Sequence, residues 1–312
     1  MQNYEESRAR LVERFETAKR ETPEKFKNRL NLSWSNWGFG LETLEQTASR
    51  LQKAGLSFIE LHGNHYGDSL GYDVAETQKI LADHGLTTAG VCGMFSEDND
   101  LASNAPIAQQ RALDYIRREL EFCQAMGGSY LLIVPAAVGR ATEYDAYEFE
   151  RSVAALRSVA DEFEPHGVKG AIEPIRADET TLVHTVKDAE RYIEAVGSPG
   201  VQHINGDVYH MQSSEWNIAE AILSAGDRLV NIHMADSNRL ALGSGSMDID
   251  AIIMALYLIG HNAPGRYVTP EPLGAGSSPY AARNGKTDPV ILDALVCDSI
   301  EYFRHREEAL LA

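Results

Sequence analysis

A regular alternation of two kinds of segment constrains the fold of this chain more than any other feature. From residue 29 onward, a short apolar segment is followed by a longer amphipathic one, and this pair recurs eight times. Several short segments are continuously β-branched or aliphatic, as parallel strands buried on both faces are. The longer segments repeat apolar residues at helical spacing and often stop at glycine, which favours a left-handed helix end.

The alternation can be written as eight strand–helix units. The predicted strands are 29–35, 57–63, 86–95, 129–137, 168–175, 200–206, 228–235 and 266–273. The predicted helices are 41–55, 74–85, 107–128, 146–167, 183–197, 217–226, 248–260 and 288–311. Repeated units of this kind form either an open, doubly wound sheet or a closed barrel. The count of eight favours a closed (β/α)8 TIM barrel of the α/β class.

The chain contains no linker rich in Pro, Gly or Ser that would divide the repeating region. We therefore expect a single (β/α)8 barrel catalytic domain over residues 29–312. Residues 1–28 are expected to form an N-terminal helical extension, in which a helix over 4–20 ends before Pro23. This helix either closes the bottom of the barrel or forms a subunit contact.

The composition sets limits on partners and compartment. The net charge is -18, and such an acidic surface repels the phosphates of nucleic acids and of anionic membranes. The three cysteines form no close pair, which indicates a reducing compartment. The N-terminus lacks the apolar core of a secretory signal, and no segment approaches the roughly 18 apolar residues of a transmembrane helix. We expect a soluble, cytoplasmic protein without nucleic-acid or membrane partners.

Four consecutive predicted strands, the fifth to the eighth, end in polar residues that could share one site. They deliver Glu173, Asp207, His233 and Glu271 to the carboxyl ends of the strands, where TIM barrels place their active sites. A single carboxylate there would most often cap a helix or turn the chain. Three carboxylates and an imidazole together repel one another unless a cation lies between them. These oxygen and nitrogen donors suit Mn²⁺, Mg²⁺, Co²⁺ or Zn²⁺, and the set lacks the thiolates of a structural zinc site.

Other polar and aromatic residues near these strand ends have two interpretations each. His210 either binds substrate or bonds a backbone carbonyl, and Arg239 either enters the site or pairs with Asp236. Trp34 and Trp37 either stack on a sugar face or belong to the core or to a lid.

The segment after the second predicted strand adds two histidines. His62 and His65 form either an additional acid/base pair or neutral residues at the rim, and His62 is a candidate for substrate binding. Cys92 on the third predicted strand is interpreted as a small core residue.

Six motifs resemble one known family. They are "AIEPI", "GDVYHM", "NIHMADSNR", "TPEPL", "GSGSMDIDAII" and "DLAS". The chain resembles the xylose isomerase-like TIM barrels from about residue 30 to the last helix. Within that superfamily it is most similar to the sugar isomerases and epimerases, in particular the ketose 3-epimerases and the inosose-processing enzymes.

The resemblance implies roles for the residues that match these motifs. Glu173, Asp207, His233 and Glu271 would bind one divalent metal ion, for which Mn²⁺ is favoured. Of these, Glu173 and Glu271 would also be the catalytic residues that move the proton.

The remaining matches concern substrate binding. His210 and Arg239 would hold the oxygens near the substrate carbonyl, and Glu179 would contact the substrate. The sequence departs from the family at residues 176–178, where "RAD" replaces the usual Asn-Arg-Phe, and at "ELHGNHYG", residues 60–67.

The expected function is a metal-dependent sugar isomerase or epimerase that removes a proton α to the carbonyl of a ketose, keto-sugar or inosose. The alternative is a lyase or dehydratase acting on an inosose or a 3-keto-(C-)glycoside. A DNA-repair enzyme like endonuclease IV is disfavoured by the net charge of -18. A non-catalytic carbohydrate-binding barrel is disfavoured by the intact ligand set. The expected partners are a small sugar or cyclitol and further copies of the chain, as a dimer or tetramer.

Overall fold

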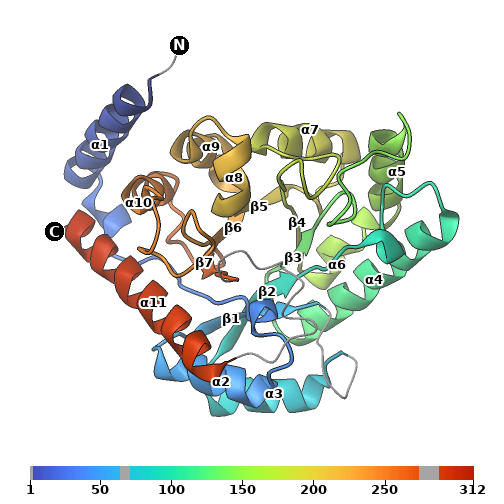
Figure 1. The fold of residues 1–312 in the computed structure, drawn as a ribbon, viewed down its shortest axis with the longest axis horizontal. Coiled ribbons are helices and arrows are strands. Elements are labelled where there is room, and N and C mark those ends of the chain that lie inside the picture. The colour runs from blue at the N-terminus through green and yellow to red at the C-terminus, as the bar shows by residue number, and fades with distance from the viewer. Residues whose placement is uncertain (1–2, 64–70, 274–287) are drawn as a thin grey trace.

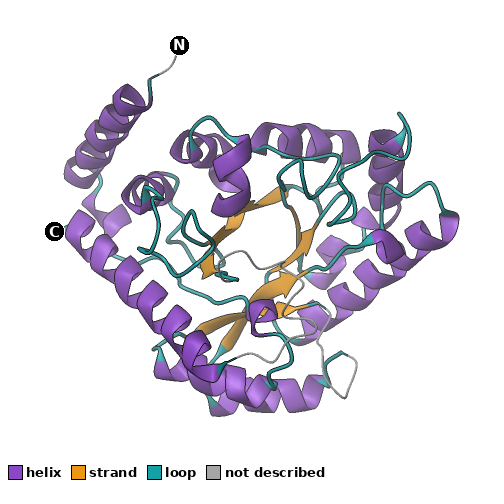
Figure 2. Ribbon diagram, viewed as in Figure 1, coloured by secondary structure: helices purple, strands orange, loops and turns teal. Residues whose placement is uncertain are grey.

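The computed structural model describes residues 3–63, 71–273 and 288–312, and in it the strands form a ring inside a layer of helices (Figure 1, Figure 2). Within these described ranges, seven parallel strands are hydrogen-bonded to one another in chain order. They are β1 (Phe58–His62), β2 (Thr87–Cys92), β3 (Tyr130–Ile133), β4 (Lys169–Ile172), β5 (His203–Asp207), β6 (Leu229–Met234) and β7 (Tyr267–Pro270). The predicted TIM barrel is confirmed.

The first predicted strand, 29–35, closes the barrel without forming a regular strand. It lies between β7 and β1 and makes one isolated bridge to each, at Leu32 and at Ser35. Backbone hydrogen bonds of 2.9 Å connect Ser33 N to the carbonyl of Val268, and Glu60 N to the carbonyl of Trp34. The eighth position is thus occupied, but its pairing is sparse because a 3₁₀-helix, η2 (Asn36–Phe39), follows at once.

Helices follow the strands on the outside of the ring. They are α1 (Tyr4–Glu21), α2 (Leu44–Lys53), α3 (Val74–Asp83), α4 (Pro106–Ala125), α5 (Glu148–Ala160), α6 (Phe163–His166), α7 (Val186–Val196), α8 (Val208–Ser214), α9 (Ile218–Ala225), α10 (Ile249–Leu258) and α11 (Pro289–Leu311). Short 3₁₀-helices are η1 (Pro23–Phe26), η3 (Glu97–Asn99) and η4 (Gly226–Arg228). As predicted, helices end at glycines with positive φ, for example Gly167 at 67° and Gly197 at 68°. None of the described helices is long and apolar enough to span a bilayer.

The N-terminal helix α1 lies along the outside of α10 (Figure 1). Its Phe15 is fully buried, and its Arg8 Nε donates a 2.6 Å hydrogen bond to Asp248 at the start of α10. Near the end of α1, Lys19 Nζ donates a 2.7 Å hydrogen bond to the carbonyl of Leu310 on α11. The helix itself therefore covers the side of the barrel, and the predicted subunit contact stays a prediction.

The inside of the barrel has an apolar end and a polar end. Phe58, Tyr130 and Tyr267, which begin β1, β3 and β7, bring their rings together with centroid distances of 5.1 Å and 6.3 Å. Because β3 and β7 are not neighbours in the sheet, these rings meet across the interior and fill the amino-terminal end of the barrel. The polar residues described below lie above them, toward the carboxyl ends of the strands.

A buried histidine beyond α10 makes the stability of the fold sensitive to acid. His261 is completely buried, and its Nε2 donates a 2.8 Å hydrogen bond to the carbonyl of Tyr267. Burial lowers the pKa of His261 from 6.5 to about 4. The unfolded chain therefore binds a proton below pH 6.5 that the folded chain does not accept until about pH 4, so stability falls as the pH falls through this window.

We expect the free energy of unfolding to fall by about 2 kcal/mol between pH 7.5 and pH 5 through His261 alone. Urea unfolding at both pH values measures this, with His261→Gln as comparison, because glutamine can donate the same hydrogen bond without titrating. An equal pH dependence in wild type and variant would contradict the assignment to His261.

Candidate active site

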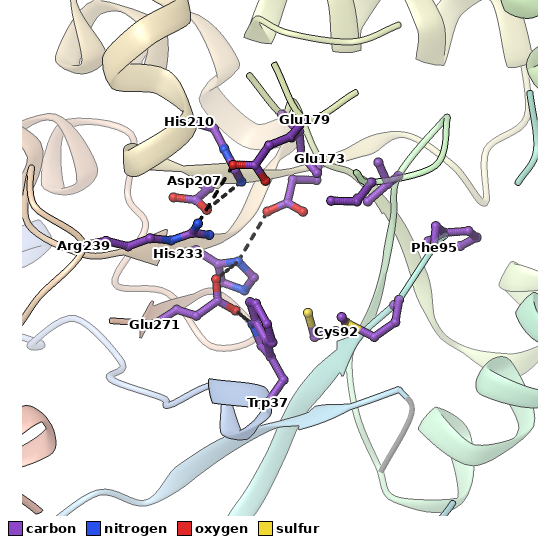
Figure 3. Close-up of a pocket in the computed structure, with 15 residues that line it drawn as sticks. Trp37, Cys92, Phe95, Glu173, Glu179, Asp207, His210, His233, Arg239 and Glu271 are labelled. Atoms are coloured by element: carbon purple, nitrogen blue, oxygen red, sulfur yellow. Dashed lines mark hydrogen bonds and ion pairs between the residues drawn. The ribbon is translucent and has the colours of Figure 1, made fainter. Parts of the chain in front are cut away.

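A pocket lies at the carboxyl ends of the strands (Figure 3). Its polar lining residues are Glu173, Glu179, Asp207, His210, His233, Arg239 and Glu271. Its other lining residues are Trp37, Cys92, Gly93, Met94, Phe95, Val134, Val138 and Ile175. The pocket thus contains all four predicted metal ligands and three of the five predicted substrate-binding residues.

The four predicted ligands line this pocket from four neighbouring strands, with His233 between the others. His233 lies within β6, Asp207 ends β5, and Glu173 and Glu271 follow β4 and β7 by one residue. His233 Nδ1 lies 3.3 Å from Glu173 Oε1 and 3.5 Å from Glu271 Oε2. Glu173, Asp207 and His233 offer ligand atoms that lie within 4.8 Å of one another. In Figure 3 the carboxylates of Glu173 and Glu271 approach the His233 ring from two sides.

The charges around His233 call for a cation. Burial raises the pKa of Glu271 from 4.5 to about 8, and the carboxylates of Asp207 and Glu173 add to the rise although His233 opposes it. Burial disfavours the charged form of His233, but the surrounding carboxylates, Glu271 first among them, raise its pKa well above 6.5. Without a metal the cluster thus retains protons, and a divalent cation would replace them. The residues present fit such an ion, because they offer carboxylate oxygens and an imidazole nitrogen.

Glu60 is a charged member of this cluster that the sequence interpretation missed. It lies within β1, is completely buried, and its Oε1 lies 2.9 Å from His233 Nε2. Glu60 lies within its strand and not at a strand end, where TIM barrels usually place their active-site residues. The available signal was a single charged residue inside the apolar segment "SFIELHG".

Asp207 and His210 are held by a helix that the sequence interpretation did not predict. No element was predicted between the strand at 200–206 and the helix at 217–226, but α8 begins directly after β5 with Asp207 as its N-cap. The Asp207 side chain accepts a 2.8 Å hydrogen bond from Tyr209 N, which satisfies a free amide of the first turn. His210 Nε2 lies 3.3 Å from Asp207 Oδ2, as the spacing of three residues allows on a helix.

His210 does not show the hydrogen bond that its alternative interpretation requires, and its role in substrate binding stays a prediction. Its Nδ1 is buried and makes no hydrogen bond to any residue that the structure describes. The alternative bond to a backbone carbonyl is therefore not formed there, and the side chain lines the pocket.

Arg239 enters the pocket instead of pairing with Asp236. The side chain of Asp236 accepts hydrogen bonds from backbone amides of its own loop, at Ser237, Gly243 and Met247. Arg239 has a left-handed φ of 61°, unusual for a residue with a side chain, and its side chain is 8% exposed.

A second arginine orders the rim beside Arg239. Arg176 is the first residue of the atypical "RAD". Its Nε donates a 2.7 Å hydrogen bond to Glu179 Oε1, and its Nη1 donates a 3.0 Å hydrogen bond to the Tyr209 hydroxyl. The two guanidiniums, of Arg176 and Arg239, lie 4.9 Å and 4.4 Å from the Tyr209 ring centroid. Glu179 is also 4.0 Å from Arg239 Nη1. The departure from the family sequence thus forms a network around Glu179.

The structure places the two tryptophans differently. Trp34 is 1% exposed and stacks on Phe39 with ring centroids 6.0 Å apart, so it belongs to the core. It does not line the pocket, as the predicted substrate contact would require. Trp37 lines the pocket, and its Nε1 donates a hydrogen bond to Glu271 Oε1.

Of the two histidines His62 and His65, only His62 belongs to the described part of the chain. His62 is buried, lies 6.5 Å from the Trp37 ring, and does not line the pocket in the described structure. His65 lies outside the described residues.

Comparisons with known proteins agree with this fold and site. The chain is 27% identical over 228 residues to the ketose 3-epimerase of Arthrobacter globiformis, covering 72% of this chain and 77% of that protein. It is 27% identical over 239 residues to the 3-dehydro-D-guloside 4-epimerase of Escherichia coli (strain K12), covering 73% and 87%. These relatives support the predicted enzyme class, an isomerase of the epimerase type.

A solved structure and a family model give the same result for the fold. The structure of an L-ribulose 3-epimerase superposes with a TM-score of 0.78 over 90% of this chain and 96% of that one, at 23% identity. The family model described as "Xylose isomerase-like TIM barrel" matches residues 48–278. With most of the chain matched, this protein belongs to the xylose isomerase-like TIM barrel family.

Proposed function

We propose that this protein is a divalent-metal-dependent sugar epimerase that removes a proton α to the carbonyl of a keto-sugar. The observation that carries the proposal is the convergence of Glu173, Asp207, His233 and Glu271 in one buried pocket. These four residues would hold one divalent ion. Their mixed oxygen and nitrogen donors suit Mn²⁺, Mg²⁺, Co²⁺ or Zn²⁺, and the resemblance to the sugar epimerases favours Mn²⁺. When bound, the ion would bind the carbonyl oxygen and offset the negative charge that develops on it.

The two glutamates are placed to act on opposite faces of a substrate. Glu173 follows β4 and Glu271 follows β7, so they face each other across the site. One would take the proton from the carbon next to the carbonyl, and the other would return a proton to the opposite face. Trp37 donates to one oxygen of Glu271, and Asn205 Nδ2 donates a 2.8 Å hydrogen bond to Glu173 Oε1, so neither carboxylate is free to rotate.

Substrate oxygens would be bound by the polar rim. His210 and Arg239 both line the pocket, and each could donate a hydrogen bond to a hydroxyl near the carbonyl. Glu179, which Arg176 holds in place, would accept a hydrogen bond from a second hydroxyl.

One wall of the pocket favours a substrate with an apolar substituent. Phe95 lies across the pocket from Arg239, and Met94, Val134, Val138 and Ile175 line the pocket too. A free ketose has hydroxyls along most of its length, whereas a keto-glycoside with an apolar aglycone would match a pocket that is polar on one side only. The named activity of the E. coli relative is on a glycoside of a keto-sugar.

The same wall carries the second candidate function, elimination from a 3-keto-glycoside. Proton removal next to the ketone begins both reactions, and the apolar wall would hold the departing aglycone. The expected homo-oligomer, the cytoplasmic location and the division at residue 28 stay predictions.

Product analysis separates these candidates. The Mn²⁺-loaded protein is incubated with free ketoses, inososes and 3-keto-glycosides, and the products are identified by NMR. A new epimer at the carbon next to the carbonyl supports the proposal, and a released aglycone supports the second candidate. Absence of both with every compound would contradict the proposed function.

A further inference from the structure

We propose that Glu60 is a positioning residue that holds His233 with its Nδ1 free to bind the metal. The proposal rests on the proposed function, and it concerns a residue inside the barrel that would touch neither substrate nor metal. Both oxygens of Glu60 lie close to His233 Nε2, at 2.9 Å and 3.1 Å. A carboxylate can only accept, so Nε2 carries the hydrogen in this pair.

The other ring nitrogen of His233, Nδ1, is then the one that can offer a lone pair when a metal displaces its proton. Asn205 Nδ2 also lies 3.4 Å from it. Nδ1 lies on the opposite side of the ring and faces Glu173 at 3.3 Å and Glu271 at 3.5 Å. A neutral imidazole with hydrogen on Nε2 is the form that can bind a metal through Nδ1. A carboxylate behind a metal-binding histidine fixes its tautomer and ring orientation and raises its basicity. Glu60 stands in that relation to His233.

Glu60 is itself fixed by neighbours that leave it little freedom. Tyr130 donates a 2.6 Å hydrogen bond from its hydroxyl to Glu60 Oε2, and Asn231 Nδ2 donates a 3.2 Å bond to the same oxygen. Tyr130 reaches Glu60 only because residue 90 is glycine, since a Cβ at Gly90 would lie 2.6 Å from the Tyr130 ring. Thr269 in turn orients Asn231 through a 2.7 Å hydrogen bond to its Oδ1.

This network continues to a second predicted ligand. Asn231 Nδ2 also donates a 2.7 Å hydrogen bond to Asn205 Oδ1, and Asn205 Nδ2 donates to Glu173 Oε1 at 2.8 Å. Glu60, Asn205 and Asn231 are each completely buried. A buried polar layer of this kind is stable only when its members are bonded to one another. The layer therefore connects the positions of His233 and Glu173.

A direct role for Glu60 as a ligand is the competing interpretation. Glu60, Cys92, His233 and Glu271 also offer ligand atoms within 4.8 Å of one another. Yet both Glu60 oxygens already accept hydrogen bonds, and an ion between Glu60 and His233 would have to displace the Nε2 hydrogen bond. The geometry thus favours positioning over coordination.

The test uses cobalt, whose visible absorption reports the ligand geometry directly. Co²⁺ is titrated into the metal-free protein, and its affinity and absorption spectrum are compared between wild type, Glu60→Gln and Glu60→Met. Methionine fills similar space without accepting the hydrogen bond, so we expect affinity to fall by about 10- to 100-fold, with a changed spectrum. In Glu60→Gln the amide oxygen still accepts from Nε2, and we expect an affinity within about tenfold of wild type and the wild-type spectrum.

A matched control separates positioning from general damage to the core. Glu307 on α11 is also completely buried, but it does not line the pocket. It accepts hydrogen bonds from the hydroxyl of Tyr257 on α10 and from the backbone amide of Leu30. Glu307→Gln should change thermal stability while leaving Co²⁺ affinity and spectrum as in wild type.

The outcomes that overturn the proposal are distinct. A folded Glu60→Met variant with wild-type Co²⁺ affinity and spectrum would refute the role of Glu60 alone. If that variant does not fold, Tyr130→Phe decides, because losing its hydrogen bond should weaken Co²⁺ binding by about threefold to tenfold. Unchanged binding in Tyr130→Phe would then overturn the proposal. A wild-type protein that binds no Co²⁺ would overturn both the positioning role and the proposed metal site.

Discussion

Replacing Glu271 by glutamine should lower kcat for epimer interconversion by about 10²- to 10⁴-fold, the usual contribution of a positioned acid or base. Glutamine keeps the shape of the side chain and can still accept the Trp37 hydrogen bond, but it cannot carry the proton. Steady-state kinetics with the substrate found by product analysis would measure the loss. A variant with more than half of the wild-type kcat would remove Glu271 from the catalytic pair.

The loss in Glu271→Gln should be one-sided. Glu173 remains and can still take a proton from the epimer whose C–H bond faces it, so that epimer should exchange its proton with solvent without being converted. Glu173→Gln should show the same pattern for the other epimer. Glu119→Gln is a suitable control, because Glu119 is a buried carboxyl on α4 outside the pocket whose pKa burial raises to about 7. Its kcat should match that of wild type.

Removing divalent metal with a chelator should abolish turnover, by at least about 10³-fold, since a cation beside the carbonyl oxygen is worth several kcal/mol to such reactions. Added Mn²⁺ should restore the activity and raise the thermal unfolding temperature in proportion to its binding. Full activity after exhaustive chelation, with metal content checked by mass spectrometry, would exclude a metal-dependent reaction.

Metal binding should also release protons. Burial and the neighbouring carboxylates raise the pKa of Glu271, and those carboxylates raise the pKa of His233. A bound cation would disfavour the protonated forms of both groups, so binding near neutral pH should release protons. Calorimetric titration in buffers of different ionisation enthalpy counts them.

The general fold and the main cluster could be predicted because they depend on repeated local patterns. Strand and helix periodicity define the barrel, and the barrel brings strand ends together whatever the loops do. Glu173, Asp207, His233 and Glu271 are therefore neighbours as a result of topology. Their roles as ligands are proposals that the chelation and variant experiments test.

The rest depended on contacts between distant residues. Glu60 faces inward by strand alternation, but only its distance to His233, 173 residues away, gives it a partner. Helix α8 is only seven residues long, and its N-cap Asp207 is a residue type that is equally common in turns, so the sequence pattern did not predict a helix there. Trp34 and Trp37 are near in sequence, yet Trp34 lies in the core and Trp37 lines the pocket, because Trp34 precedes η2 and Trp37 lies within it.

The most direct test of the central claim is proton exchange in D₂O. The Mn²⁺-loaded protein is mixed with the ketose, inosose or 3-keto-glycoside panel, and NMR follows deuterium at each carbon. Deuterium appearing only at the carbon next to the carbonyl, and lost in the Glu173→Gln, Glu271→Gln double variant, is the expected result. If every compound keeps its protons with the metal-loaded wild type, or if the double variant exchanges as fast as wild type, proton transfer by this pair of glutamates is contradicted.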